Sequence, residues 1–300
     1  MTPAVLRRAW VAWIAVCLIW GTTYLAIKVA LETIPPFLMG GIRYVLAGMI
    51  LSAWLIARQD GLPPVREWGR LAVLGFLMIT LGNGGVVWGE QYLASGLTAV
   101  VIATSPFWMV AIDTMLPGAD RLTLRQWGGL FIGFCGIVVL MWPDLSQGGA
   151  IGRATGLGIL SVQIACIGWA IASAYTRRHA VSRNVLGVAA VQMFFGGLFM
   201  VLIGTAAGEW PHLAFVPRTL AAFVYLTLAG SVIAFAAYSY ALRHLPIATV
   251  SLYTYVNPVI AVTLGTVLLG EPFHVTMLAG AAVIAVGMLV VRPAKRRARA

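Results

Sequence analysis

Three tryptophans stand near the centre of long apolar segments, at Trp20, Trp108 and Trp169. An indole N–H surrounded by apolar side chains needs a polar partner on another helix or an aqueous cavity. Tyr24 and Tyr253 stand in similar surroundings. The face of each ring attracts an ammonium or pyridinium cation by about 0.5–2 kcal/mol. Two interpretations remain open for these rings: a site for a small amphipathic molecule, or packing between helices.

Neutral polar side chains occur in the same segments. Asn257 follows Tyr253 by four residues, so the two share one face of a helix. Amides and hydroxyls of this kind can hydrogen-bond the amino or carboxylate group of a small ligand. They can also bind a neighbouring helix, which is the favoured interpretation for Gln163. Ser231 is a further candidate. The residues predicted to bind substrate are Trp20, Tyr24, Thr80, Asn83, Trp108, Gln163, Trp169, Tyr253 and Asn257.

Charged side chains are rare inside the apolar segments. Arg43 lies well inside one of them and could bind a substrate carboxylate, a helix carbonyl or Glu90. Lys28 lies about one turn from the end of its segment, so we expect its amine to reach the surface. No carboxylate lies at the middle of a segment. No proton site is therefore evident, and Glu90 is only a minor candidate.

Several classes of chemistry are excluded by what the sequence lacks. It contains no Gly-x-x-x-x-Gly-Lys-Ser/Thr phosphate loop, so ATP is not the direct energy source. The four histidines lie in loops or at segment ends without metal-ligand spacing, and the three cysteines are far apart. Only isolated serines occur in mid-segment, which argues against an intramembrane hydrolase. We therefore predict a protein that is not an enzyme and has no cofactor and no metal.

The apolar segments have the length of membrane helices. Of the 300 residues, 61% are hydrophobic and 10% are charged, a balance that no soluble domain of this length could bury. A helix crosses hydrocarbon about 30 Å thick with roughly 20 residues. The sequence therefore predicts an all-α membrane protein with ten transmembrane helices. The predicted spans are 10–31, 36–57, 68–90, 96–116, 127–142, 155–175, 185–207, 219–242, 247–269 and 275–291.

The distribution of positive charge predicts the orientation of the protein in the membrane. The net charge of +11 could suggest a nucleic-acid partner, but the charges lie between the apolar segments, so we expect none. With the N-terminus inside, all but four of the 20 lysines and arginines lie on the cytoplasmic side; the exceptions are Lys28, Arg43, Arg153 and Arg218. The positive-inside rule thus places both termini in the cytoplasm. The first segment lacks a small-residue cleavage site, so we expect it to remain as a helix.

The chain resembles itself when its two halves are compared. A shift of 152 residues aligns Pro106 with Pro258, and a shift of 149 residues aligns Trp20 with Trp169. Five spans per half is an odd number, so the second half would enter the membrane in the opposite direction. We predict two inverted five-helix repeats within one membrane unit, residues 1–145 and residues 146–300.

Short motifs resemble a known family over essentially the whole chain. They are the stretch from Trp20 to Tyr24 with Lys28, the pair Arg43-Tyr44, and Leu269-Gly270-Glu271-Pro272. Together with the repeats they are similar to the drug/metabolite transporter superfamily. Within it they resemble the ten-helix EamA-type exporters, and among these the bacterial branch that exports aromatic and other amino acids and methyl viologen. The four-helix multidrug relatives couple to protons through a glutamate in the first helix. Here the middle of that helix contains no acid, so the resemblance does not supply a coupling mechanism.

Proline at equivalent places in the two halves suggests gating. Pro106 and Pro258 cannot donate to the carbonyl four residues earlier, so the oxygens of Ile102 and Thr254 are expected to be unpaired. Such prolines in inverted repeats point to a binding site and to two kinked gating helices. Kinks without a function are the alternative interpretation.

Small residues predict how the fifth and tenth spans meet. Gly129 and Gly133 form one small-residue face, and Ala281 and Ala285 form another at the positions shifted by 152. These spans are expected to pack on each other away from the substrate path. Because this contact imitates a dimer interface within one chain, a monomer should be sufficient for function.

Taken together, the sequence favours a secondary transporter of the bacterial inner membrane. We expect it to export amino acids and other small amphipathic metabolites or toxic organic cations by alternating access. Its expected partners are that small-molecule substrate and membrane lipid. A transporter of another metabolite class, such as nucleotides or sugars, and a lipid flippase are the alternatives.

Overall fold

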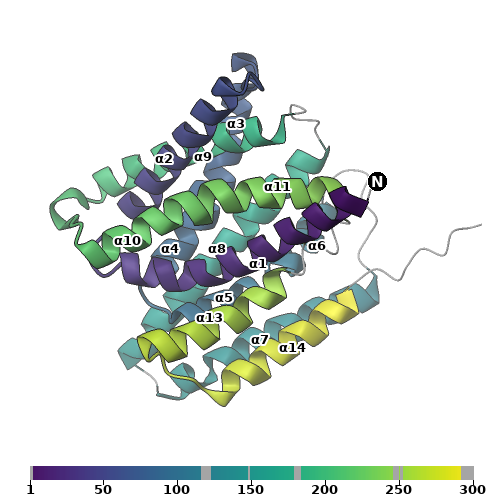
Figure 1. Cartoon of the computed structure of the whole chain (residues 1–300). Coiled ribbons are helices and arrows are strands. Elements are labelled where there is room, and N and C mark those ends of the chain that lie inside the picture. The colour runs from purple at the N-terminus through teal and green to yellow at the C-terminus, as the bar shows by residue number, and fades with distance from the viewer. Residues whose placement is uncertain are drawn as a thin grey trace, which may run out of the picture.

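The computed structural model describes residues 3–115, 123–147, 149–178, 184–245, 250 and 253–291. Within these ranges the chain is almost entirely helical, and no strand occurs in them. The helices lie against one another as one bundle (Figure 1). The protein therefore has an all-α membrane fold.

Ten helical stretches are present in the described part of the chain. Those of the first half are α1 (Pro3–Ala30); α2 (Pro36–Ala57); η1 (Val65–Glu67), α3 (Trp68–Gly75), η2 (Phe76–Asn83) and α4 (Gly84–Gly89) in continuous succession; α5 (Ser95–Ile102) with α6 (Ser105–Met115); and α7 (Leu124–Gln147). Those of the second half are α8 (Gly149–Arg178); α9 (Val185–Ala206); α10 (Pro217–Tyr225), η4 (Leu226–Ile233) and α11 (Ala234–His244) in succession; α13 (Tyr253–Leu269); and α14 (Val275–Val291). A single turn, η3 (Trp210–His212), lies between α9 and α10.

Length and composition alone identify membrane-crossing helices among these stretches. Six are long and apolar enough to span a bilayer, namely Pro3–Ala30, Pro36–Ala57, Val65–Gly89, Gly152–Thr176, Val185–Ala206 and Pro217–Tyr238. Three further apolar helices are shorter: Ser95–Met109, Val256–Leu269 and Val275–Gly287. The predicted spans thus match the helices closely where apolar runs are long.

The third and eighth stretches contain a feature that the sequence did not predict. Each includes eight residues of π-helix, η2 and η4, which begin 150 residues apart at Phe76 and Leu226. A π-helix shifts hydrogen bonding from the fourth to the fifth residue and frequently occurs at functional sites. Both segments contribute to the site described below.

The fourth stretch is broken rather than kinked. α5 ends at Ile102, and α6 begins at Ser105, so Pro106 is the second residue of a new helix, where proline is well tolerated. Ser105 Oγ donates to the carbonyl oxygen of Ile102 at 2.7 Å. The prediction of an unpaired oxygen at Ile102 was therefore wrong. Pro258 does lie inside a helix, α13, and it is buried.

Close helix pairs hold the bundle together. α2 packs along α9, and α7 packs along α14, side by side at the lower edge of the bundle in Figure 1. At the second pair, a Cβ added to Gly287 would lie 2.6 Å from the backbone nitrogen of Gly133 and 2.7 Å from the carbonyl oxygen of Gly129. The predicted contact between the fifth and tenth spans is confirmed, with Gly287 at its closest point.

Four connections whose residues are all described lie at the end of the bundle opposite the N-terminus of α1: residues 31–35, 90–94, 207–216 and 270–274. We call this end the far side and the other end the N-terminal side. Thr33 Oγ1 donates to the carbonyl oxygen of Ala214 at 2.7 Å and hydrogen-bonds the hydroxyl of Thr219 at 2.8 Å. These bonds join the first of the connections to the third.

Two Gly-Glu pairs strengthen the far side. Gly208 and Gly270 have positive φ angles of 72° and 64°, which end α9 and α13 and turn the chain sharply. The glutamate that follows each then caps a different helix. Glu209 accepts hydrogen bonds from the first backbone N–H groups of α2, at 3.2 and 2.7 Å, and Glu271 accepts from Ser95 at the start of α5, at 2.8 Å. Carboxylates at helix N-termini are stabilising because unpaired N–H groups point toward them.

Candidate functional site

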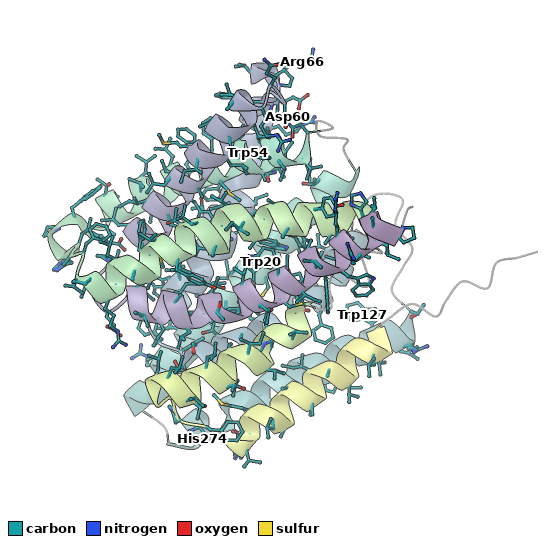
Figure 2. The ribbon with its side chains drawn as sticks, in the orientation of Figure 1. Trp20, Trp54, Asp60, Arg66, Trp127 and His274 are labelled. Carbon is teal, nitrogen blue, oxygen red and sulfur yellow. The ribbon has the colours of Figure 1, made fainter. Side chains whose placement is uncertain are left out.

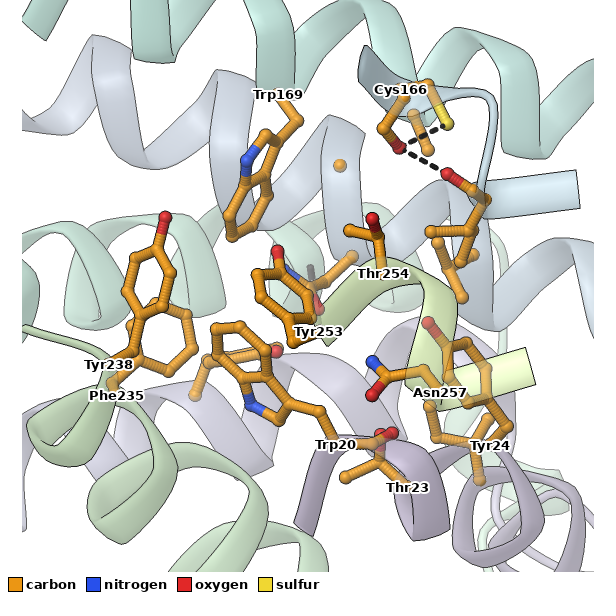
Figure 3. Close-up of a pocket in the computed structure, with 18 of the residues that line it drawn as sticks. Trp20, Thr23, Tyr24, Cys166, Trp169, Phe235, Tyr238, Tyr253, Thr254 and Asn257 are labelled. Carbon is orange, nitrogen blue, oxygen red and sulfur yellow. Dashed lines mark hydrogen bonds between the residues drawn. The ribbon is translucent and has the colours of Figure 1, made fainter. Parts of the chain in front are cut away.

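A cavity of about 270 Å³ lies at the centre of the bundle (Figure 3). It is bounded by α1, α2, η2 and α4, the break between α5 and α6, α8, α11 and α13. Its lining residues are Trp20, Thr23, Tyr24, Ile27, Arg43, Tyr44, Gly82, Asn83, Val86, Ile102, Ser105, Met109, Ala165, Cys166, Trp169, Phe235, Tyr238, Val250, Tyr253, Thr254 and Asn257.

Aromatic rings form one wall of the cavity. The ring of Trp20 contacts Phe235, Tyr238 and Tyr253, with centroid separations of 5.5, 5.2 and 4.9 Å. These rings come from α1, α11 and α13 and gather on one side of the opening in Figure 3, while Trp169 from α8 faces the same space. Edge-to-face contacts with Phe235 and Tyr253 and a tilted contact with Tyr238 fix the ring of Trp20 in place. The wall can therefore offer ring faces to an apolar or cationic ligand.

The π-helical segment η4 supports this wall. Its Gly230 carbonyl oxygen accepts a hydrogen bond from Trp20 Nε1 at 3.1 Å. The indole N–H thus has a partner inside the bundle, and the orientation of the ring is fixed. A Cβ added to Gly230 would lie 3.0 Å from the side chain of Thr23 and 3.1 Å from Arg43 Nη2. Glycine at this position therefore makes room for the arginine.

Arg43 brings a positive charge to the cavity. It is 3% exposed, its Nε donates to Ser231 Oγ at 2.9 Å, and its Cζ lies 4.7 Å from the centre of the Tyr44 ring. Within the described ranges, no carboxylate forms an ion pair with it. A buried guanidinium is costly unless a negative group compensates it, and its planar N–H groups match a carboxylate.

Asn257 ties two of the walls together. In the amide orientation that satisfies its neighbours, with oxygen and nitrogen exchanged, its side-chain nitrogen donates to the carbonyl oxygens of Cys17 at 3.2 Å and Tyr253 at 3.0 Å. Tyr24 interacts with the same amide group. The amide therefore links α1 to α13 and holds a polar patch opposite the aromatic wall.

Lys28 and Glu90 lie between the cavity and the far side. Lys28 Nζ donates to the backbone oxygens of Glu90 at 2.7 Å and Leu93 at 2.8 Å. Its amine is thus bound at the end of α4 and at the connection that follows it. A backbone carbonyl at a helix end is a good acceptor for a cation, because the helix dipole is negative there.

The structure brings together six of the nine residues predicted to bind substrate. Trp20, Tyr24, Asn83, Trp169, Tyr253 and Asn257 line the cavity. The other three lie elsewhere. Thr80 Oγ1 donates to the Gly196 carbonyl oxygen at 2.8 Å, and Trp108 Nε1 donates to Gln163 Oε1 at 2.7 Å. These three residues make contacts between helices and do not line the cavity. For Gln163, the sequence had favoured such a contact between helices. The side chain of Pro106 lies outside the described part of the chain.

Depth along the helix distinguishes Trp20, which lines the cavity, from tryptophans near helix ends. Figure 2 shows Trp20 in the middle of the bundle and Trp54 and Trp127 at its edge. Trp127 is 60% exposed, as expected of a ring at the membrane interface. Phe235 and Tyr238 were not predicted, although they lie three residues apart and therefore on one face of α11. The spacing of these two rings was the signal available in the sequence.

Comparison with known proteins agrees with this geometry. A model of the EamA-like transporter family matches residues 8–142 and again residues 156–292. The uncharacterised inner membrane transporter YedA of Escherichia coli is 36% identical over 261 residues, which cover 86% of this chain and 81% of that protein.

More distant relatives cover nearly the whole chain. The uncharacterised transporter YvbV of Bacillus subtilis is 22% identical over 94% of this chain and 91% of its own length. The chloroplastic WAT1-related protein At3g02690 of Arabidopsis thaliana is 25% identical over 94% of this chain and 69% of its own length. Among the solved structures that match is a crystal structure with a TM-score of 0.66 at 22% identity, covering 94% of this chain and 96% of the other, which supports the fold. With the family model covering both halves, the chain belongs to the EamA-like transporter family and is a membrane transporter, not an enzyme.

Proposed function

We propose that this transporter exports amino acids and other small amphipathic metabolites, including toxic organic cations, by alternating access. The observation that carries the proposal is the pairing of an aromatic wall around Trp20 with the guanidinium of Arg43, which forms no ion pair among the described residues, in one cavity. Arg43 suits a carboxylate, and the ring faces suit an apolar side chain or an ammonium group. An amino acid carries all of these groups.

The size of the cavity favours a small substrate. Ligand pockets commonly enclose roughly 300–1,000 Å³, and this one encloses about 270 Å³. That volume suits one amino acid or a compact cation. A lipid with two acyl chains would not fit, which argues against a flippase in this conformation.

Two inverted repeats, residues 1–145 and 146–300, would supply the alternating movement. The family model matches each half separately, and η2 and η4 begin at positions 150 residues apart. The pairing of α2 with α9 and of α7 with α14 joins equivalent helices of the two halves. The packing of α7 on α14 also supports function as a monomer. The small-residue faces of both helices are buried against each other within one chain, so they are not available to a second copy.

We assign the N-terminal side to the cytoplasm of a bacterial cell and the far side to the outside of its inner membrane. This follows from the distribution of lysine and arginine and places both termini in the cytoplasm. The Glu209 and Glu271 caps and the bonds made by Lys28 then close the outer side. This conformation would load substrate from the cytoplasm.

Counterflow in proteoliposomes tests the proposal. Vesicles containing purified protein are loaded with one unlabelled compound and assayed for uptake of its labelled form, using amino acids, organic cations, a sugar, a nucleotide and a fluorescent lipid. We expect saturable uptake of an amino acid or cation that accelerates when the unlabelled compound is inside. Flux that never saturates would indicate a channel, and lipid movement alone would indicate a flippase. Either result would overturn the proposal.

A further inference from the structure

Glu90 occupies an unusual place beside the cavity. It follows α4 and lies one helical turn beyond Val86, which lines the cavity, so both residues share one helix face. Its exposed fraction is 0%. Neither of its carboxyl oxygens has a hydrogen-bond partner in the described structure. By contrast, the carboxyl oxygens of Glu209 and Glu271 are occupied by helix N-termini.

Groups of both signs surround this carboxyl. Lys28 and Tyr24 approach from α1, Arg43 from α2, and Glu271 from the connection after α13, and each interacts with it electrostatically. None of them gives it a hydrogen bond. The amine of Lys28 donates to backbone oxygens, and Arg43 Nε donates to Ser231. The carboxyl therefore lies within a charged cluster without a direct partner.

The protonation state of Glu90 follows from this arrangement. A carboxylate ion buried without a hydrogen bond or ion pair costs several kcal/mol, whereas the neutral acid costs far less. The closed far side thus accommodates Glu90 as an acid that holds its proton. Opening the far side would bring water to the carboxyl and allow it to exchange that proton.

We propose that Glu90 is a proton-binding site that couples export to the proton gradient. The inference rests on the proposed function, since it assigns the co-substrate of the same cycle. With the far side open, the Glu90 carboxylate takes one proton from water on that side. Closure buries the neutral acid. Substrate that enters the cavity from the cytoplasm, one turn away at Val86, displaces the proton to water on that side and regenerates the carboxylate. One proton thus moves inward for each substrate that moves outward.

Infrared spectroscopy of the purified protein tests proton binding without any substrate. We expect the carbonyl band of a protonated carboxyl near neutral pH that disappears in Glu90→Gln and remains in Glu32→Gln. Glu32 is the matched control, because it is an exposed acid at the same end, paired with Arg218 at 2.9 Å. Glu90→Asp should retain a protonated-acid band at a shifted position. This variant tests the assignment of the band if Glu90→Gln does not fold. A band that is absent in the wild type, or unchanged in both Glu90 variants, would overturn the proposal.

Transport in proteoliposomes tests the coupling. A gradient of one pH unit can sustain an about tenfold substrate gradient at one proton per substrate. We expect Glu90→Gln to lose this accumulation and the substrate-induced proton flux, read with a trapped pH dye, while retaining counterflow. Glu32→Gln should behave as the wild type. Accumulation driven by the proton gradient in Glu90→Gln would overturn the inference. Absence of counterflow for every compound in the wild type would instead overturn the proposed function, while the infrared band still decides the role of Glu90.

Discussion

Lys28 Nζ lies 2.7 Å from the backbone oxygen of Glu90 and so ties the far end of α1 to the end of α4. The same amine reaches Leu93 at 2.8 Å, at the connection that leads into α5. One side chain therefore holds three elements together at the point where the cavity would open to the far side.

Replacing Lys28 by Met should weaken this closure. The methionine retains the apolar stem but cannot donate to the two carbonyl oxygens, so the far side should open more often. A cysteine introduced at Ile27, which lines the cavity, should then react faster with a membrane-impermeant thiol reagent applied from the far side. Arg218→Gln, on an exposed pair with Glu32, is the control. Equal labelling in both variants would show that Lys28 does not close the far side.

Replacing Arg43 by Gln should change substrate preference. The variant loses the only positive charge among the residues that line the cavity in the described structure. A charge-assisted hydrogen bond contributes about 1.5–3 kcal/mol, so apparent affinity for an amino acid should fall about 10- to 150-fold. Affinity for an organic cation without a carboxylate should be unchanged or higher. Competition assays measure both, and an equal loss for the two ligands would argue against carboxylate binding.

Replacing Gly287 by Leu should destabilise the pair α7 and α14. Its Cβ would lie 2.6 Å from the backbone nitrogen of Gly133, so the two helices would have to separate. Overpacking of this kind typically costs about 1–3 kcal/mol. The midpoint of thermal unfolding in detergent should fall, whereas Gly128→Ala, where a Cβ meets nothing within 4 Å, should leave it nearly unchanged. Similar midpoints in the two variants would contradict tight packing at Gly287.

The two prolines should differ in their effect on transport. Pro258 lies inside α13, so Pro258→Ala should restore a backbone hydrogen bond, stiffen the helix and slow transport without unfolding the protein. Pro106 is the second residue of α6, where alanine fits equally well, and Pro106→Ala should transport normally. Transport rates at matched protein levels test this. A larger loss in Pro106→Ala would restore the idea of two equivalent gates.

Apolar length was enough to predict most of the fold. The spans at 36–57 and 185–207 match α2 and α9 closely, because an uninterrupted apolar run must be helical in lipid. The π-helical segments could not be predicted in the same way. Their residues are ordinary apolar residues, and the change in hydrogen bonding depends on packing against neighbouring helices.

The candidate site was predicted only in part, for a related reason. Depth along a helix can be read from sequence, and it pointed to Trp20 and Trp169, which both line the cavity. The direction in which a side chain points around the helix cannot be read when every face is apolar, so Thr80 and Trp108 were placed in the cavity although they contact other helices. Arg43 was recognised as unusual, but its position beside Ser231 depends on the way α2 meets η4.

The most direct test of the account compares counterflow in Trp20→Ala and Trp127→Ala. Trp20 contacts three rings of the cavity wall, whereas Trp127 is 60% exposed at the edge of the bundle. Ring–ring and ring–cation contacts contribute about 1–2 kcal/mol, so Trp20→Ala should reduce apparent substrate affinity about tenfold. Trp127→Ala, at an equal amount of folded protein, should match the wild type. Equal affinities in the two variants would contradict the assignment of this cavity as the substrate site.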